Sequence, residues 1–301
     1  MSVHPEAQNF LVLTAQAPEL DTRTPAENRA ANEASQHLMG EQTPVAVVKD
    51  VLIRDVPVRI YNPYPGRDRQ PVFLYFHGGG WVLGDLDTVD STVRDIAATS
   101  GALCISVDYR RAPEHPFPAA LDDCLAVTAA VLEGEVQGVD SHMVAVGGDS
   151  AGGNIAAVIA QELRDVIAHQ VLIYPVMDLS SFQTPSHEQY SAGYFLSRKR
   201  LEYFYDSYAQ AHDRRDPRLS PGLNKDLEGM PPATIISAEC DPLADEVSAY
   251  GEALQHAGNV VSHVQFKGQV HPFVQMSSII SDALVARRLI AGELAEVFLR
   301  T

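Results

Sequence analysis

The sequence predicts an α/β fold with a central, mostly parallel sheet flanked by helices. From about residue 70 onward, short and almost continuously apolar segments alternate with stretches of helical periodicity. Strands of that composition are typical of parallel sheets whose two faces are both buried. The chain has 301 residues, of which 46% are hydrophobic, which is enough for one large α/β domain or two small ones.

The expected elements can be followed along the chain. The segments 45–53 and 56–63 contain many β-branched residues and are each followed by turn residues, so they predict an antiparallel pair of strands. Further strands are expected at 71–76, 102–109, 143–148, 170–176, 233–238 and 260–266. Helices are expected near 87–99, 118–132, from about 151, and over 281–299.

Two segments lie outside this alternation. Residues 1–44 are polar and helical, and residues 179–231 contain no clear strand. A long insertion in a compact domain usually has a function, often as a lid over the site. We therefore expect a catalytic core at 45–178 and 232–301, with a helical cap at 1–44 and 179–231.

Charge and cysteine content exclude several classes of function. The chain has 22 Lys and Arg against 39 Asp and Glu, a net charge of −17, so nucleic acid and anionic membrane surfaces are poor partners. No apolar run approaches the ~18 residues of a membrane span. The three cysteines are odd in number and form no C-x-x-C pair, so they suggest neither a disulfide framework nor a zinc ribbon. Since the N-terminus also lacks a signal-peptide pattern, we expect a cytoplasmic protein.

A candidate nucleophile is Ser150, in the sequence Gly148-Asp149-Ser150-Ala151-Gly152. The motif follows an apolar strand and opens a predicted helix, as a serine on a sharp strand-to-helix turn requires. Glycines two positions before and after the serine remove side chains that would clash in such a turn. The alternative is a surface turn serine, but the flanking strand and helix favour the nucleophile.

A candidate oxyanion hole is the sequence HGGGW at 77–81, directly after the predicted strand 71–76. Consecutive glycines leave backbone N–H groups free to donate to the oxyanion of a tetrahedral intermediate. We expect the donors to be Gly78 or Gly79, with Gly80 as a further candidate, together with Ala151. A flexible linker would not follow a buried strand directly, and the loop lacks the G-K-[ST] ending of a phosphate-binding P-loop.

Two further side chains of this motif have expected roles. His77 is expected to brace the loop by hydrogen bonding. Trp81, the only tryptophan, either lines the substrate pocket or anchors the core, and we treat it as a candidate substrate-binding residue.

The orienting acid is expected after the nucleophile in the chain. Asp241 follows the predicted strand 233–238, at the carboxyl end where α/β sheets place functional loops. Asp245 and Glu246 are rivals, but on the following helix they are expected to be solvated or N-terminal helix charges.

The base is expected between the last strand and the last helix. His271 lies there, whereas His263 is inside the strand pattern and His256 is on the preceding helix. His271 would take the proton of Ser150 during attack on an ester carbonyl, and Asp241 would orient the imidazole. We expect no metal and no cofactor, since the 11 histidines form no metal-ligand motif.

With these motifs in place, the sequence resembles the bacterial hormone-sensitive-lipase family of esterases, in its G-D-S-A-G branch. The matching segments appear in the family's order at 77–85, 108–123, 148–154, 241–246 and 271–273. The resemblance implies an α/β-hydrolase fold, a triad of Ser150, Asp241 and His271, and a helical cap. It also implies a carboxylic-ester hydrolase that prefers short to medium acyl chains.

Other functions on the same fold are a non-catalytic small-molecule receptor, a lyase and an amidase. The receptors that resemble this family lack the histidine, and the related lyases have an altered nucleophile, so His271 and Ser150 argue against both. Nothing in the sequence excludes an amidase. We expect a small-molecule ester as substrate, and a monomer or homodimer.

Overall fold

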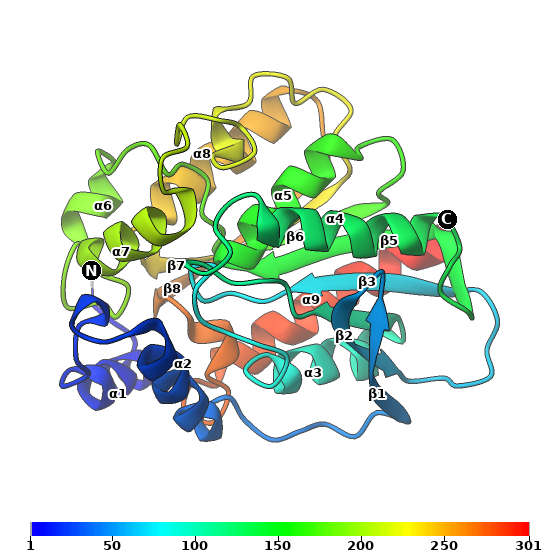
Figure 1. The fold of residues 1–301 in the computed structure, drawn as a ribbon, viewed down its shortest axis with the longest axis horizontal. Helices are drawn as coiled ribbons and strands as arrows, with labels where there is room; N and C mark the ends of the chain where they lie inside the picture. Colours follow the sequence, from blue (N-terminus) through cyan, green and yellow to red (C-terminus); the bar gives the residue numbers. More distant parts are fainter. Residues whose placement is uncertain (1, 301) are drawn as a thin grey trace.

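The fold is built on one sheet, as seen in the computed structural model, which describes residues 2–300 (Figure 1). Its strand order is β1-β2-β4-β3-β5-β6-β7-β8. Strand β2 is antiparallel to β1 and β4, and every other neighbouring pair is parallel. The predicted α/β fold with a mostly parallel sheet is therefore confirmed.

The strands lie where the apolar segments predict them. Their bounds are β1 Val47–Ile53, β2 Val56–Asn62, β3 Gln70–Phe76, β4 Leu103–Val107, β5 Val139–Asp149, β6 His169–Ile173, β7 Ala233–Cys240 and β8 Val261–Val270. Strands β7 and β8 run further than the apolar segments indicate, because their pairing continues past an irregularity between Ala238 and Cys240. As a result Asp241 and His271 each follow the last residue of a strand.

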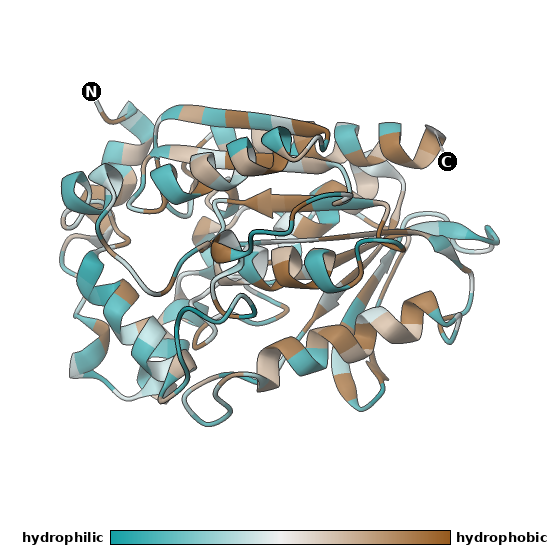
Figure 2. Cartoon of the chain, turned by 90° about the horizontal axis from the view of Figure 1, so that it is seen from above, coloured by the Kyte–Doolittle hydropathy of each residue, from teal (hydrophilic) through white to brown (hydrophobic). Residues whose placement is uncertain are grey.

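Helices cover both faces of the sheet. The larger ones are α3 Asp90–Ser100, α4 Ala119–Leu132, α5 Ala151–Glu162, α8 Ala244–His256 and α9 Asp282–Arg300. In Figure 1, α4, α5 and α8 lie on one side of the sheet, and α3 and α9 lie on the other. All five residues of β4 and all five of β6 are buried. In Figure 2 the strands in the middle of the molecule are mostly hydrophobic, and the surrounding helices carry both hydrophobic and hydrophilic residues.

The two polar segments are helical. The N-terminal segment contains α1 Pro5–Thr14 and α2 Pro25–Ala34, and the insertion at 179–231 contains α6 Pro185–Gln189 and α7 Arg198–Ala209. Helices α1, α2 and α6 all begin with proline, whose fixed φ suits the first helical position. Pro5, Pro25 and Pro185 thus each start a helix.

The N-terminal segment and the insertion lie side by side. Both are at the left of Figure 1, at the end of the sheet toward which β3 points. The rings of Phe10 and Phe195 are 4.9 Å apart, and Lys199 Nζ lies 3.1 Å from Asp21 Oδ1. Among residues 2–300, no helix has both the length and the apolar character needed to cross a bilayer.

Candidate functional site

Ser150 lies on the turn between β5 and α5. Its backbone angles, φ +54° and ψ −117°, belong to neither element, and such strain is typical of residues held for function. The two motif glycines allow this turn to pack against β3. A Cβ on Gly148 would lie 2.2 Å from the carbonyl oxygen of Phe76, and one on Gly152 would lie 1.9 Å from the same atom. Neither position has room for a side chain.

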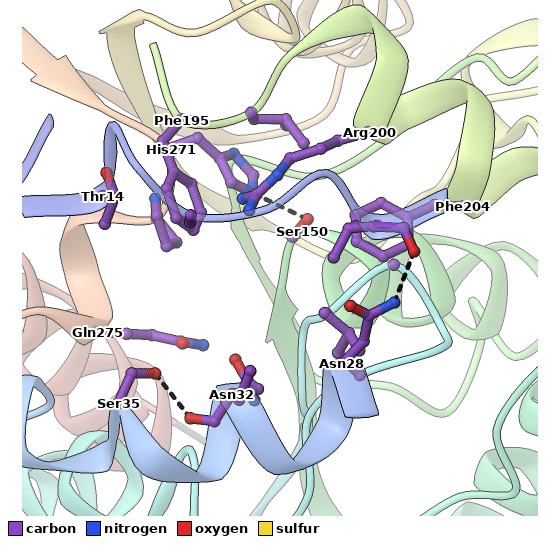
Figure 3. Close-up of a pocket in the computed structure, with 18 of the residues that line it drawn as sticks. Thr14, Asn28, Asn32, Ser35, Ser150, Phe195, Arg200, Phe204, His271 and Gln275 are labelled. Carbon is purple, nitrogen blue, oxygen red and sulfur yellow. Dashed lines mark hydrogen bonds between the residues drawn. The ribbon is translucent and has the colours of Figure 1, made fainter. Parts of the chain in front are cut away.

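The structure brings Ser150, His271 and Asp241 together, and Figure 3 shows His271 beside Ser150. His271 Nε2 lies 3.0 Å from Ser150 Oγ, and His271 Nδ1 lies 2.8 Å from Asp241 Oδ2. The three residues are only 9%, 4% and 1% exposed, in the order Ser150, His271, Asp241. With the imidazole proton on Nδ1, Asp241 accepts it, and the free Nε2 accepts the hydrogen of the serine hydroxyl.

Neighbouring groups hold the acid and the base in place. Asp241 Oδ1 accepts a hydrogen bond from the backbone N–H of Leu243, at 2.9 Å. The ring of Tyr174 packs against the imidazole of His271, with centroids 4.5 Å apart. The orientation of both partners is therefore fixed by buried contacts.

The rival residues have other partners. His263 makes a hydrogen bond to Ser237 inside the sheet, at 2.8 Å. Of the two alternatives expected for Glu246, it is not solvated but lies in the first turn of α8. It is buried, lies 3.2 Å from His187 Nε2 and accepts the N–H of Met177, and its burial raises its pKa. Asp245 accepts the backbone N–H of Ser186 at 2.7 Å.

The glycine loop at 77–81 faces Ser150 with part of its backbone already engaged. The N–H of Gly78 donates to Asp149 Oδ1 at 3.0 Å, so this candidate oxyanion donor is occupied. Within residues 2–300, the amides of Gly79, Gly80 and Ala151 have no backbone or side-chain acceptor. Of the four amides expected as oxyanion donors, these three are therefore still available to a bound substrate.

His77 braces the loop as expected. Its Nδ1 lies 2.8 Å from the carbonyl oxygen of Gly78, and its ring stacks on Tyr109 with centroids 4.0 Å apart. Burial lowers the pKa of His77 to about 4, so it is neutral at physiological pH. The neutral, stacked imidazole therefore positions the loop by donating its Nδ1–H to the carbonyl oxygen of Gly78.

Asp149 is a residue of the site to which the sequence assigned no role. Its carboxylate accepts hydrogen bonds from the hydroxyl of Tyr75, the N–H of Gly78 and the amide of Gln275. Burial nevertheless raises its pKa to about 6. The sequence signal for a role of Asp149 was its place inside the G-D-S-A-G motif. The residue before the serine ends β5 and faces the glycine loop.

A cavity of about 230 Å³ opens beside Ser150 and His271 (Figure 3). Both polar segments contribute to its walls. The N-terminal segment supplies Phe10, Leu20, Asn28 and Met39 among others, and the insertion supplies Phe195, Leu196, Arg200, Leu201, Phe204 and Tyr205.

Trp81 combines the two roles considered for it. It lines the cavity, yet it is fully buried and stacks face to face on Tyr208, with ring centroids 4.4 Å apart. Its packing role is thus plain, and direct contact with substrate stays a prediction.

Comparison with known proteins places the chain in a family. The model of the α/β hydrolase fold matches residues 73–275, which is more than half of the chain. The chain belongs to this family. The family predicted from the motifs is thereby confirmed, and the match spans the segment from β3 to the residues that follow His271.

Several relatives of this α/β hydrolase have named activities. The ethyl acetate hydrolase of Pseudomonas putida is 37% identical to it over 94% of the chain and 95% of that protein. Carboxylesterase NlhH of Mycobacterium tuberculosis is 41% identical over 78% of the chain and 76% of that protein. The solved structure of a hyperthermophilic esterase from the archaeon Pyrobaculum calidifontis superposes with a TM-score of 0.93 at 36% identity, covering 98% of this chain and 99% of that one.

Proposed function

We propose that this α/β hydrolase is a carboxylic-ester hydrolase in which Ser150 is the nucleophile, His271 the general base and Asp241 the orienting acid. The supporting observation is the hydrogen-bonded chain of the three side chains, 3.0 Å and 2.8 Å long, at the wall of a cavity. Ester hydrolysis itself is confirmed by relatives named as ester hydrolases.

The geometry suggests the order of steps. Ser150 Oγ attacks the ester carbonyl carbon while His271 Nε2 takes the hydroxyl proton. The carbonyl oxygen becomes an oxyanion, to which Gly79, Gly80 and Ala151 donate their N–H groups in our proposal. His271 then returns the proton to the leaving alcohol. Water, deprotonated by the same imidazole, cleaves the acyl-enzyme and restores Ser150.

The cavity supports a limit on substrate size. A volume of about 230 Å³ next to Ser150 suits a small acyl ester, and we propose short to medium acyl chains as substrates. The residues at 2–44 and 179–231 would act as the cap that defines this volume. A non-catalytic receptor is disfavoured, because His271 is present and lies within hydrogen-bond distance of Ser150.

We also propose a cytoplasmic location and a monomer or homodimer. All three cysteines, Cys104, Cys124 and Cys240, are buried free thiols, which suits a reducing compartment.

The test of this function is hydrolysis of p-nitrophenyl acetate or butyrate by the purified protein. Ser150→Ala is expected to lower kcat by about 10⁴-fold or more, because the nucleophile is lost while the fold is kept. Ser180→Ala, at an exposed serine, is the matched control and should keep wild-type activity. Undiminished turnover in Ser150→Ala would remove Ser150 from its proposed role.

A further inference from the structure

In the described part of the chain, one partly buried charge of the cavity has neither a hydrogen-bonded nor an ionic partner. Arg200 lies in the first turn of α7, is partly buried and lines the same cavity as Ser150 and His271. In Figure 3 its side chain extends from α7 into the cavity. Within residues 2–300 its guanidinium makes no hydrogen bond and no ion pair, and the charge of the exposed Glu19 acts on it without such a contact.

The neighbours of Arg200 make this lack of a partner informative. Arg198 Nε lies 2.9 Å from Glu202, and Lys199 Nζ lies 3.1 Å from Asp21, so the other two bases of this turn have carboxylate partners. A cation in the first turn of a helix is also disfavoured by the helix dipole. Arg200 thus gains no stability from an ion pair or from the helix dipole.

The surroundings of the Arg200 guanidinium favour the binding of an anion. Its Cζ lies over the Phe195 ring, 4.5 Å from the ring centroid, and its N–H groups have no acceptor among residues 2–300. Burial lowers its pKa, but an arginine stays charged at neutral pH. A charge removed from water without a counter-ion is costly, and a bound anion would relieve that cost.

The charges that line the cavity favour an anion as well. Among the described residues, Arg23 and Arg200 are the lining bases besides His271, and Asp149 is the only lining acid. Asp149 is already engaged by three donors. This local excess of positive charge stands out in a protein whose net charge is −17.

We propose that Arg200 binds a carboxylate carried by the substrate, so that the preferred substrates are esters with a free acid group near the scissile bond. The proposal rests on the proposed ester hydrolysis at Ser150 and names the substrate class of that site. The carboxylate can be carried by the acyl group, as in a dicarboxylic acid monoester, or by the alcohol, as in an acylated hydroxy acid. Either one presents the guanidinium with the same planar acceptor.

The test compares matched charged and neutral esters. One pair is mono-p-nitrophenyl glutarate and p-nitrophenyl pentanoate, for the acyl side. The other pair is O-acetyl lactate and its uncharged methyl amide, for the alcohol side. For each pair the ratio of kcat/KM, charged over neutral, is measured in the wild type, Arg200→Gln, Arg200→Lys and the control Lys199→Gln.

In at least one pair, Arg200→Gln is expected to lower the ratio by about tenfold to a hundredfold, the effect of a lost charged hydrogen bond. Arg200→Lys should keep part of the preference and Lys199→Gln all of it. Added salt should reduce the wild-type ratio. An unchanged ratio in both pairs for Arg200→Gln would overturn the proposal.

Binding of glutarate, measured by titration calorimetry on Ser150→Ala, separates this proposal from the esterase function. Binding that is lost in the double variant with Arg200→Gln supports the anion site even without turnover. Equal binding in both variants contradicts it. If the wild type hydrolyses neutral esters but shows no Arg200-dependent preference, the esterase function stands and only the anion site is rejected.

Discussion

At the scale of single residues, Asp149 shows how burial and hydrogen bonding oppose each other. Burial favours the protonated carboxyl, while Tyr75 and Gly78 donate to the ionised form, and burial has the larger effect. Its pKa is about 6, compared with an ordinary value of 3.8. The folded protein therefore binds this proton more tightly than the unfolded chain does.

The sign of the resulting pH dependence follows from this pKa. Between pH 3.8 and about 6 the unfolded chain loses the proton first, so ionising Asp149 progressively destabilises the fold as pH rises. Asp149→Asn cannot ionise, and its amide oxygen can still accept from Tyr75 and Gly78. We expect its stability relative to the wild type to rise by about 2–4 kcal/mol over that window and then level off.

Urea unfolding of both proteins at a series of pH values measures this difference. Asp68→Asn, at an exposed position, is the control and should follow the wild type throughout. A stability difference between Asp149→Asn and the wild type that stays constant from acid to neutral pH would contradict the proposed origin of the shift.

The residues of the site differ in how far sequence predicts them. Ser150, Asp241 and His271 each follow a strand that can be recognised from its apolar residues, so their chain order and position were enough to select them. The engaged amide of Gly78 could not be predicted, because it depends on which way the Asp149 side chain turns. Arg200 belongs to no recognisable sequence motif, and only the three-dimensional structure shows that it lacks an ionic partner.

At the scale of elements, the first turn of α5 is packed directly on the end of β3. A Cβ at Gly152 would lie 1.9 Å from the carbonyl oxygen of Phe76 and 2.6 Å from that of His77, and neither backbone atom can move freely. This contact fixes Ser150 next to the glycine loop, since the loop begins at His77. The close approach of helix and strand is therefore a condition for the site.

Alanine substitutions at two helical glycines test this contact. Gly152→Ala is expected to destabilise the protein by about 3 kcal/mol or more, because α5 must move away from β3. Gly292→Ala in α9 is the control, since a Cβ there meets nothing within 4 Å. It should raise stability by up to about 1 kcal/mol through helix propensity. Thermal unfolding measures both, and equal behaviour of the two variants would argue against tight packing at Gly152.

The elements were largely predictable because strands buried on both faces leave a strong apolar signal. The extents of β7 and β8 were less predictable, because the charged residues Glu239 and Lys267 and the glycine Gly268 near their ends are not typical of strands. Hydrogen bonding between the two strands overrides that local preference, and it carries Asp241 and His271 to the same edge of the sheet.

At the scale of the whole molecule, the cavity depends on two segments far apart in the chain. The sequence indicates that residues 1–44 and 179–231 are helical and polar, but not that Phe10 meets Phe195 or that Asp21 pairs with Lys199. Such contacts between surface helices follow from shape and have no periodic signature. The walls of the cavity, and hence the substrate range, were therefore beyond sequence reasoning.

Wall residues of α7 should set the acyl-chain preference. Leu201 lines the cavity and is 2% exposed, so Leu201→Ala enlarges the space beside Ser150. We expect the best p-nitrophenyl ester to become longer, with a loss of stability of about 2–5 kcal/mol from the removed packing.

Leu227→Ala is matched in chemistry and burial, at 5% exposed, but Leu227 does not line the cavity. It should lose comparable stability and keep the wild-type chain-length profile, measured as kcat/KM over a graded series of esters. If both variants shift the profile alike, general loosening of the fold controls the acyl-chain preference, and the shape of this wall does not. If neither variant shifts it, the acyl chain does not lie against α7.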